Sequence, residues 1–250
     1  MPKLAILILT YNEEVNIVPC IESAAFADEV VVVDSGSGDR TVELARQLGA
    51  KVVTRKFDGF GPQRNFALTQ TDADWVMFLD ADERITSALA AEMRSAADSG
   101  ELAAYEILRH NYAFGQRIMH GGFRPDYSLR FYPRSAISWD GVVHEQATVT
   151  VPKRKMRGVM LHHTYTDWDR YFVKFNSYTT LMARKMHEQG RRGTMIHIMF
   201  RPWWAFLKFY IFQSGWRDGR LGFILSAFHF FYTMAKYVKL YYLQAEEKNQ

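Results

Sequence analysis

Aliphatic runs alternate with stretches of mixed polarity over about the first hundred residues. The runs have the near-continuous Val, Ile and Leu content of parallel strands buried on both faces. We expect strands at residues 4–9, 29–33, 51–54 and 75–79. We expect helices at residues 15–25, 41–48, 62–68 and 87–97, with Gly49 as a C-cap and Ser87 as an N-cap. This alternation predicts a doubly wound, mostly parallel α/β sheet.

The rest of the chain has a different pattern. Residues 102–163 are less periodic and rich in Arg, Gly, Tyr and His, which indicates short strands and long loops. Helices are predicted at residues 167–189, 194–213 and 221–243, and residues 244–250 have the composition of a frayed polar tail. We therefore divide the chain into an α/β domain, residues 1–165, and a helical C-terminal region, residues 166–250.

Composition excludes several classes of protein. The chain has 250 residues, of which 48% are hydrophobic and 23% charged. These are ordinary values for a globular protein, and they exclude a disordered chain, a collagen-like fibre and a polytopic membrane protein. The net charge of +4 is too small and too dispersed to indicate nucleic-acid binding.

The single cysteine, Cys20, excludes an internal disulfide and a Cys-cluster zinc site, and it favours a reducing compartment. The short apolar run at the N-terminus is followed by Asn12, Glu13 and Glu14, so we expect no secretory signal there.

Aromatic and basic residues interleave from residue 201 to residue 243, where Asp218 is the only acid. The longest charge-free run, residues 221–235, is shorter than the roughly 20 residues that a membrane-spanning helix needs. The pattern predicts helices that lie in the plane of an anionic bilayer surface. A packed helical subdomain or the interface of a homo-oligomer is the alternative.

Carboxylates follow the fourth predicted strand in the motif Asp80-Ala81-Asp82-Glu83. Ligands of open α/β sheets bind beyond the carboxyl ends of the strands. Carboxylates one residue apart can reach one divalent cation, Mg²⁺ or Mn²⁺, which would also bind substrate phosphate oxygens. The alternative for an isolated D-x-D is a solvated acidic turn.

The second predicted strand ends in a turn of small residues, 34–39. Asp34 could accept a hydrogen bond from a base or a ribose, and the alternative is a tight turn in which Asp39 caps the next helix. The G-x-G-x-x-G spacing and the Walker P-loop are both absent from the sequence.

The first predicted strand ends in Thr10-Tyr11-Asn12-Glu13. Tyr11 could stack on a base, whereas Asn12 and Glu13 could be helix caps. Arg64 could meet a diphosphate or could simply lie on a helix face.

The motifs T-Y-N-E-E, D-S-G-S-G-D-R-T, G-P-Q-R-N and D-A-D-E, in this order, resemble those of family 2 glycosyltransferases of the GT-A fold. The resemblance covers about the first 100 residues and implies a nucleotide-sugar donor, usually a UDP-sugar, and inversion at the anomeric carbon. It assigns the nucleoside pocket to Thr10, Tyr11, Asn12, Glu13 and Asp34. It assigns Asp80 and Asp82 to the diphosphate and metal site, and Arg64 to a nucleotide contact.

The middle of the chain is similar to lipopolysaccharide-core β-glucosyltransferases of the WaaE type, in H-G-G-F-R-P-D-Y-S-L-R-F-Y-P-R, W-D-G-V-V-H-E and L-H-H-T-Y. Family 2 enzymes often place a catalytic carboxylate in an E-D pair after the metal motif. This chain has no obvious E-D pair in that region, and His144-Glu145 is the position that we match to it. An inverting transfer needs a base for the acceptor hydroxyl proton. We expect Glu145 as that base, with His144 as its competitor or its orienting partner.

Other polar residues of the middle region complete the predicted site. Asp126 could orient acceptor hydroxyls. His162 could be a further metal ligand or could support one. Arg124 and Arg130 could bind an anionic acceptor such as a phosphorylated sugar, or form surface salt bridges. The metal would stabilise the negative charge on the leaving diphosphate.

Together these expectations describe a sugar transferase that acts on a lipopolysaccharide-core or other lipid-linked acceptor. We expect it in the cytoplasm, peripheral on the inner face of the cytoplasmic membrane. A metal-dependent nucleotidyltransferase is the alternative enzyme, although residues 10–14 lack the Gly-rich basic loop typical of that class. A membrane-bound scaffold with an inactive GT-A domain is the non-catalytic alternative.

Overall fold

The computed structural model describes residues 1–123, 125–140, 146–166 and 168–248. The chain forms two compact units, Met1–His110 with Asp126–His162 (unit 1) and Asn111–Pro125 with His163–Gln250 (unit 2). The domain boundary at residue 165 stays a prediction. The two units differ from it mainly because residues 111–125 group with the C-terminal helices.

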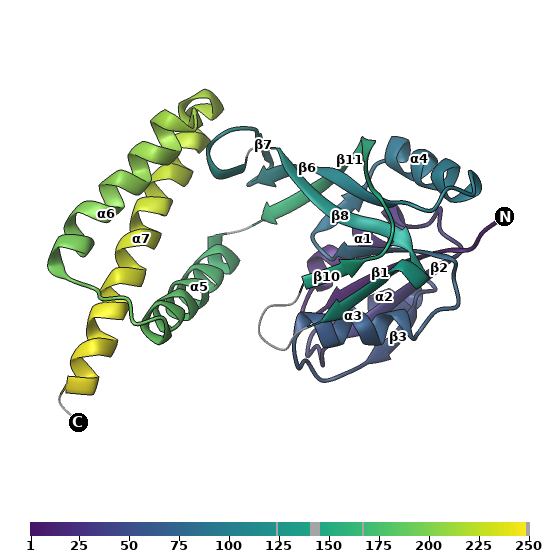
Figure 1. The fold of residues 1–250 in the computed structure, drawn as a ribbon, viewed down its shortest axis with the longest axis horizontal. Coiled ribbons are helices and arrows are strands. Elements are labelled where there is room, and N and C mark those ends of the chain that lie inside the picture. The colour runs from purple at the N-terminus through teal and green to yellow at the C-terminus, as the bar shows by residue number, and fades with distance from the viewer. Residues whose placement is uncertain (124, 141–145, 167, 249–250) are drawn as a thin grey trace. The chain divides into compact units, whose positions relative to one another are not determined.

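The N-terminal strands form the parallel half of a mixed sheet that has nine strands over the described residues (Figure 1). Its order is β3-β2-β1-β4-β8-β6-β11-β5, with β7 paired to β6. The parallel strands are β1 (Leu4–Thr10), β2 (Glu29–Asp34), β3 (Lys51–Thr54) and β4 (Trp75–Asp80). The four predicted strands are therefore confirmed to within one residue.

The other half of the sheet contains antiparallel pairs. Strand β8 (Asp126–Pro133) pairs antiparallel with β4 and with β6 (Ala104–Ala113), and β5 (Glu83–Ile85) pairs antiparallel with β11 (Lys153–Tyr165). The prediction of only short strands in residues 102–163 is wrong here, because β6 has 10 residues and β11 has 13. Charged side chains interrupt the apolar alternation of these strands. The remaining strands are short: β7 (Gln116–Ile118), β9 (Ile137–Asp140) and β10 (Gln146–Val149).

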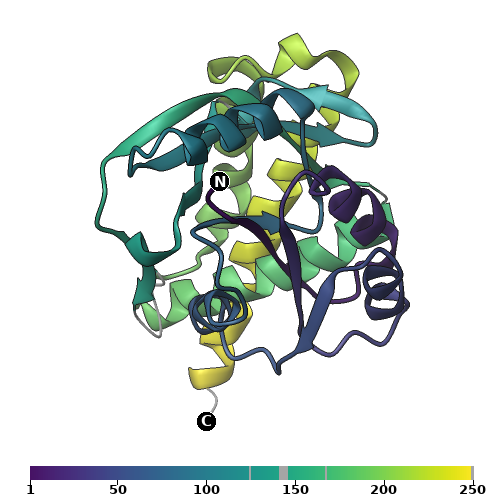
Figure 2. The same ribbon diagram turned by 90° about the vertical axis from the view of Figure 1, so that its right-hand side faces the viewer.

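Helices cover both faces of the sheet in unit 1. They are α1 (Glu14–Ser23), α2 (Thr41–Gln47), α3 (Phe60–Leu68) and α4 (Ser87–Asp98). Figure 2 shows α1 and α2 on one side of the purple strands and α3 on the other. The N-cap of α4 is Thr86 rather than the predicted Ser87, because the Thr86 hydroxyl accepts from the Leu89 N–H at 3.3 Å.

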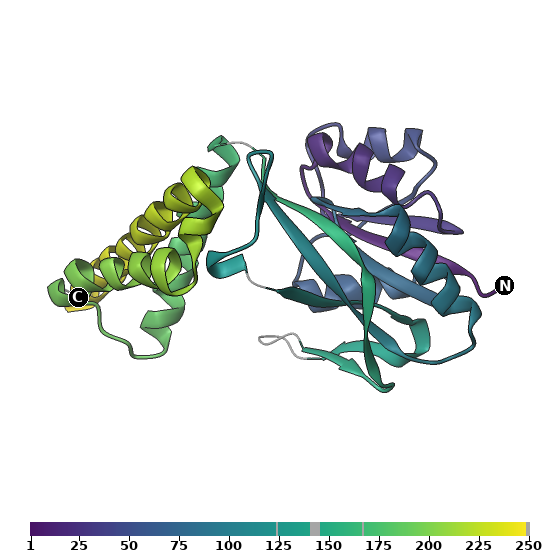
Figure 3. The same cartoon turned by 90° about the horizontal axis from the view of Figure 1, so that it is seen from above.

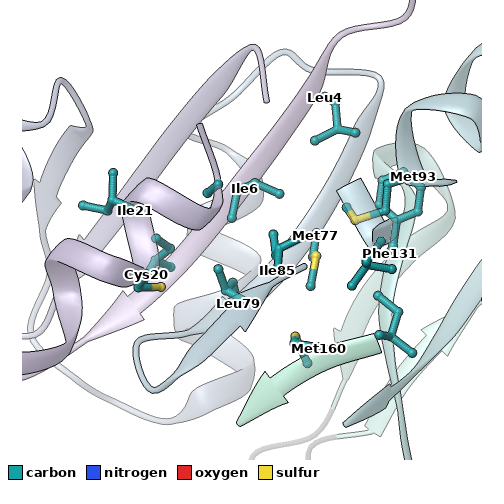
Figure 4. Packing of buried hydrophobic residues seen from close by; sticks show 14 of the residues in the cluster. Leu4, Ile6, Cys20, Ile21, Met77, Leu79, Ile85, Met93, Phe131 and Met160 are labelled. Carbon is teal, nitrogen blue, oxygen red and sulfur yellow. The ribbon is translucent and has the colours of Figure 1, made fainter. Parts of the chain in front are cut away.

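The core of unit 1 follows from the alternation of side chains along β1. Leu4, Ile6 and Ile8 pack into the cluster that includes residues of α1, α2 and α4, whereas Ala5 and Leu7 pack into the cluster that includes α3. Figure 4 shows the first cluster. Both faces of the sheet are therefore filled, and the strand register determines which polar strand ends lie side by side.

Unit 2 is mainly helical (Figure 3). Its helices are α5 (Trp168–Glu188), α6 (Met195–Leu207) and α7 (Gly219–Lys248), and a π-helical turn, Lys208–Phe212, continues α6. Helix α7 packs against both α5 and α6. The three predicted helices are confirmed, but the frayed tail is wrong for residues 244–248, which continue α7.

The Lys239 ammonium joins α7 to α5 in unit 2. It donates to the Asn176 carbonyl at 2.9 Å and to the Thr179 and Thr180 hydroxyls at 2.8 and 2.7 Å. In the part of the chain that the structure describes, no helix has the length and apolar character needed to cross a membrane.

Candidate functional site

Three polar strand ends meet at one edge of the parallel half-sheet. Thr10 of β1 lies opposite Asp34 of β2, and Leu9 lies opposite Asp80 of β4. The register therefore brings together the first, second and fourth strand ends that the sequence singled out. Such an edge is the usual ligand site of an open α/β sheet.

Asp34 shapes the turn that follows β2. It is 1% exposed, and its Oδ2 accepts from the N–H groups of Gly36 at 2.8 Å and Ser37 at 2.9 Å. The Ser37 hydroxyl donates to Oδ1. Gly36 has φ +95°, which only glycine adopts without strain. Asp34 thus holds the loop, and its contact with a nucleoside stays a prediction.

Asn12 connects the loops after β1 and β2. Its N–H donates to the Ser37 hydroxyl and its Oδ1 accepts from the Gly38 N–H, both at 2.8 Å. Its φ of 54° is left-handed, a conformation that Asn tolerates better than most residues. Asn12 is therefore a link between loops rather than a helix cap.

Tyr11 and Glu13, the two neighbours of Asn12, differ in their surroundings. Tyr11 is 59% exposed, so its ring is available for stacking. Glu13 is at the N-cap position of α1 without a side-chain cap hydrogen bond, and its Oε2 accepts from the Asn16 amide at 2.7 Å. The predicted cap position of Glu13 is therefore confirmed, although its side chain makes no capping hydrogen bond.

Two buried polar atoms near this edge have no hydrogen-bond partner within the described chain: Thr10 Oγ1 and Gln63 Oε1. Gln63, on α3, donates through Nε2 to the Ser35 hydroxyl at 3.3 Å and to the Arg55 carbonyl at 3.2 Å. Buried polar atoms usually have partners, and a bound ligand is one way to satisfy them. Gln63 was missed at sequence level, although it lies in the G-P-Q-R-N motif.

Arg64 and Asn65 hold α3 against β9. The Arg64 guanidinium lies 5.6 Å from the ring centroid of Phe60 and 5.7 Å from that of Trp139. The Asn65 amide donates to the Trp139 carbonyl at 2.7 Å and accepts from the Trp139 N–H at 3.0 Å. The nucleotide contact of Arg64 stays a prediction, and Asn65 is a positioning residue that sequence reasoning missed.

A chain of five charged residues runs from the D-A-D-E motif across β8 and β6. Arg130 Nη2 donates to Asp80 at 2.6 Å and to Glu83 at 2.8 Å. Arg109 donates to the same Glu83 oxygen at 3.2 Å and to Asp126 at 2.9 Å. Glu83 is completely buried and lies between two cations. Glu83 and Arg109 were not predicted as site residues.

The network shifts the pKa values of its carboxyl groups in opposite directions. Burial raises the pKa of Glu83 above its ordinary value, although the Arg130 charge opposes that shift. Partial removal from water also raises the pKa of Asp80. The charge and the hydrogen bond of Arg130 outweigh this effect, so the pKa of Asp80 lies below its ordinary value. Asp80 is therefore held as a carboxylate.

The predicted acceptor role of Arg130 stays a prediction, and the structure gives this residue a different set of partners. Its side chain is 8% exposed and pairs with Asp80 and Glu83. It is therefore not the surface salt bridge that the sequence left as the alternative. Asp126 lies at the start of β8, within the same network.

The predicted metal ligands fit a divalent cation in part. Asp82 Oδ2 lies 3.6 Å from His162 Nε2, a separation at which one ion could bind both. Asp80 instead forms an ion pair with Arg130. No group of three His, Cys, Asp or Glu side chains that could hold a metal ion occurs within the described residues. The metal site formed by Asp80, Asp82 and His162 stays a prediction.

Glu145, His144 and Arg124 lie outside the described residues. Their roles as base, orienting partner and acceptor ligand stay predictions.

The structure defines an α/β domain whose polar strand ends meet at one edge of the sheet, and comparison with known proteins identifies its family. Residues 5–157 match the profile of Glycosyl transferase family 2. Lipopolysaccharide core biosynthesis glycosyltransferase LpsC of Rhizobium meliloti is 31% identical over 264 residues, which cover 98% of this chain and 96% of LpsC. Glycosyltransferase RT0209 of Rickettsia typhi is 28% identical over 273 residues, which cover 100% of this chain and 90% of the relative.

Among solved structures, TarS 1–349 of S. aureus in complex with UDP-GlcNAc superposes with a TM-score of 0.51 at 16% identity, covering 99% of this chain and 92% of TarS 1–349. This likeness supports the fold alone. The chain belongs to glycosyltransferase family 2, and the predicted GT-A-like α/β fold is confirmed.

Proposed function

We propose that this family 2 glycosyltransferase moves a sugar from a UDP-sugar to a hydroxyl of a lipopolysaccharide-core or other lipid-linked glycan, with inversion. The observation that carries the proposal is the register that gathers the ends of β1, β2 and β4 at one edge. Two named proteins support the choice of substrates: the relative LpsC is named for lipopolysaccharide core biosynthesis, and TarS has been solved with UDP-GlcNAc.

The donor would occupy the edge formed by these strand ends. Thr10 and Gln63 each offer a buried oxygen with no partner in the described chain, which suits hydrogen bonding to a nucleoside. Tyr11 would stack on the base, while Asn12, Glu13 and Asp34 keep the two loops in shape. Arg64 and Asp80 would lie along the diphosphate.

A divalent metal, Mg²⁺ or Mn²⁺, would be held by Asp82 and His162, with Asp80 close by. When bound, such an ion supplies Lewis-acid stabilisation of the leaving diphosphate. Arg130 fixes Asp80 through a hydrogen bond of 2.6 Å and balances its charge.

The transfer itself needs one proton acceptor. The acceptor oxygen forms a bond to the anomeric carbon, the bond from that carbon to the diphosphate oxygen breaks, and the hydroxyl proton moves to a carboxylate, for which we propose Glu145. His144 would orient that carboxylate, Asp126 would bind acceptor hydroxyls, and Arg124 would contact an anionic group of the acceptor.

We place the enzyme in the cytoplasm, on the inner face of the cytoplasmic membrane. Cys20 is a buried free thiol, which fits a reducing compartment.

A donor screen tests the proposed reaction. Purified protein is incubated with single UDP-sugars, Mn²⁺ and a core oligosaccharide, and UDP release is measured. We expect acceptor-dependent UDP release with one preferred donor. Pyrophosphate release from a nucleoside triphosphate would instead indicate a nucleotidyltransferase, and no release with any donor would indicate a scaffold.

The metal ligands are tested in the same assay. Asp82→Asn replaces a carboxylate with an uncharged and poorer ligand, so we expect turnover to fall about a hundredfold or more. Asp72→Asn, an exposed carboxylate elsewhere in unit 1, serves as the matched control. Unchanged turnover of Asp82→Asn at saturating Mn²⁺ would contradict the assignment.

A further inference from the structure

Helix α6 carries an exposed apolar stripe. We define the α6 apolar face as Ile196, Met199, Phe200, Trp203, Trp204 and Leu207. Its members recur every three or four residues, so they lie on one side of the helix. Ile196, Phe200 and Trp203 are 68%, 64% and 60% exposed. Exposed apolar residues that occur singly need no explanation, but a contiguous patch of this kind usually marks a binding surface.

The opposite side of α6 is the one that packs within unit 2. Pro202 and Ala205 are buried, and α6 packs on α7. At about 100° per residue these two positions lie roughly opposite the α6 apolar face. Most of the stripe therefore faces away from this packing, although the Trp203 ring also meets the Phe230 ring of α7 edge to face at a centroid distance of 4.9 Å. Ile211, Phe212 and Trp216 extend the exposed apolar surface beyond the C-terminal end of α6.

The charges around the α6 apolar face have one sign. Arg201 and Lys208 are exposed on α6 and directly after it, and Arg217 and Arg220 follow. Asp218, the only acid in residues 201–243, does not offset them at the surface. Its carboxylate is 6% exposed and accepts from the His120 N–H at 2.9 Å, and it lies 2.8 Å from His120 Nδ1. The structure thus buries the carboxylate of the one acid in residues 201–243.

We propose that the α6 apolar face lies in the plane of an anionic bilayer, with its aromatic rings among the lipid headgroups and Arg201 and Lys208 on anionic lipid. Tryptophan rings and basic side chains together are typical of helices that lie in this interface. A second copy of the chain fits less well, because a two-fold interface on this face would bring like charges together. This surface deepens the proposed function, since it supplies the docking mode for a lipid-linked acceptor.

The test uses the full chain and vesicles of two compositions, phosphatidylglycerol with phosphatidylcholine and phosphatidylcholine alone. We expect co-flotation with the anionic vesicles and weaker binding to the neutral ones. Lipids brominated on their acyl chains should quench tryptophan fluorescence, and Trp203→Phe/Trp204→Phe should lose most of this quenching.

Two pairs of variants separate the apolar and charge contributions. Phe200→Ser/Trp203→Ser should abolish flotation with both vesicle types. Each lost Lys or Arg contact is worth a factor of about five, so Arg201→Glu/Lys208→Glu should weaken anionic binding more than tenfold. Arg46→Glu/Lys153→Glu makes the same charge change at exposed positions of unit 1 and should bind anionic vesicles more tightly than Arg201→Glu/Lys208→Glu.

Three outcomes would overturn the proposal: no vesicle binding by the intact chain, binding that Phe200→Ser/Trp203→Ser leaves unchanged, or a lipid-free dimer that these substitutions dissociate. UDP release with a water-soluble core oligosaccharide is measured in parallel. Retained release without vesicle binding refutes the membrane face alone, whereas vesicle binding without release refutes only the proposed reaction.

Discussion

Single side chains at the strand ends bear on both donor binding and the stability of the fold. The Thr10 hydroxyl is buried and has no hydrogen-bond partner within the described chain. An unsatisfied buried polar group costs about 1–3 kcal/mol, which a bound ligand would recover. Stability and donor binding should therefore respond in opposite directions to its removal.

Thr10→Val removes the hydroxyl and keeps the shape of the side chain. We expect the free energy of unfolding without ligand to stay the same or rise by about 1 kcal/mol, because no hydrogen bond is lost. The dissociation constant of UDP should rise about fivefold or more. Urea unfolding and calorimetric titration with UDP measure the two quantities. Unchanged UDP affinity would remove Thr10 from the nucleoside pocket.

Glu83 is the second decisive residue, because it lies between Arg130 and Arg109 without exposure to solvent. Glu83→Gln would leave two largely buried cations with one carboxylate fewer. Because burial raises the pKa of Glu83 and so disfavours its charge, we expect a loss somewhat below the roughly 3–5 kcal/mol that breaking a buried pair typically costs. The matched control is Glu43→Gln, whose carboxylate pairs with Arg40 at the surface and should contribute little to stability. Urea unfolding compares the two variants, and equal losses would contradict the central position of Glu83.

The site residues divide into those that sequence could and could not reveal. Asp34, Asp80 and Asp82 follow apolar strands directly, so the end-of-strand rule indicates them. Arg109 lies 26 positions after Glu83 on a separate strand, and only the sheet order brings the two together.

At the scale of elements, the parallel strands were predictable and the antiparallel ones were not. Strands β1, β2 and β4 are mostly buried, which leaves a continuous apolar run in the sequence, whereas the edge strand β3 has no buried residue. Strands β6, β8 and β11 carry site residues such as Arg109, Arg130 and His162, and these break the alternation that would identify a strand.

Packing of β11 on α4 requires a glycine. A Cβ atom at Gly158 would lie 2.6 Å from the Leu89 Cα, a backbone atom that cannot rotate away. Gly158→Ala should therefore lower the free energy of unfolding by about 1–3 kcal/mol, as overpacking does. Gly38→Ala is the control, because a Cβ there meets open space. Equal stability of the two variants would contradict the close approach of β11 to α4 at Gly158.

The helical unit contains a buried histidine that should make it sensitive to acid. Burial, with smaller contributions from the charges of Lys236 and Lys208, lowers the pKa of His229 on α7 to about 4. The unfolded chain binds this proton near pH 6.5, so below that pH protonation favours the unfolded state, and stability is lost as the pH falls toward 4.

His229→Phe keeps a ring at the position that stacks on Phe209 at a centroid distance of 4.0 Å, and it removes the titrating group. Between pH 7 and pH 4.5 the native chain should lose about 2–3 kcal/mol more than the variant. Urea unfolding at both pH values checks this. Parallel losses in the two proteins would contradict the assigned pKa shift.

At the scale of the whole molecule, the sequence indicated an α/β part and a helical part but not how they interleave. Residues 111–125 belong with the helices, because the His120 and Met119 N–H groups donate to Asp218 and β7 pairs with the end of β6. The amino-acid composition of residues 111–125 does not indicate that they group with the helices. Family membership, by contrast, was readable from motifs in the first hundred residues and is confirmed by the profile match over residues 5–157.

The proposed function requires that the chain transfer a sugar to a lipopolysaccharide-core glycan. Mass spectrometry of a core oligosaccharide, after incubation with the preferred UDP-sugar and Mn²⁺, tests it most directly. We expect an acceptor heavier by one glycosyl residue, formed with release of UDP and absent with Asp82→Asn. An acceptor of unchanged mass, while the same protein consumes the donor only by hydrolysis at every acceptor concentration, would contradict it.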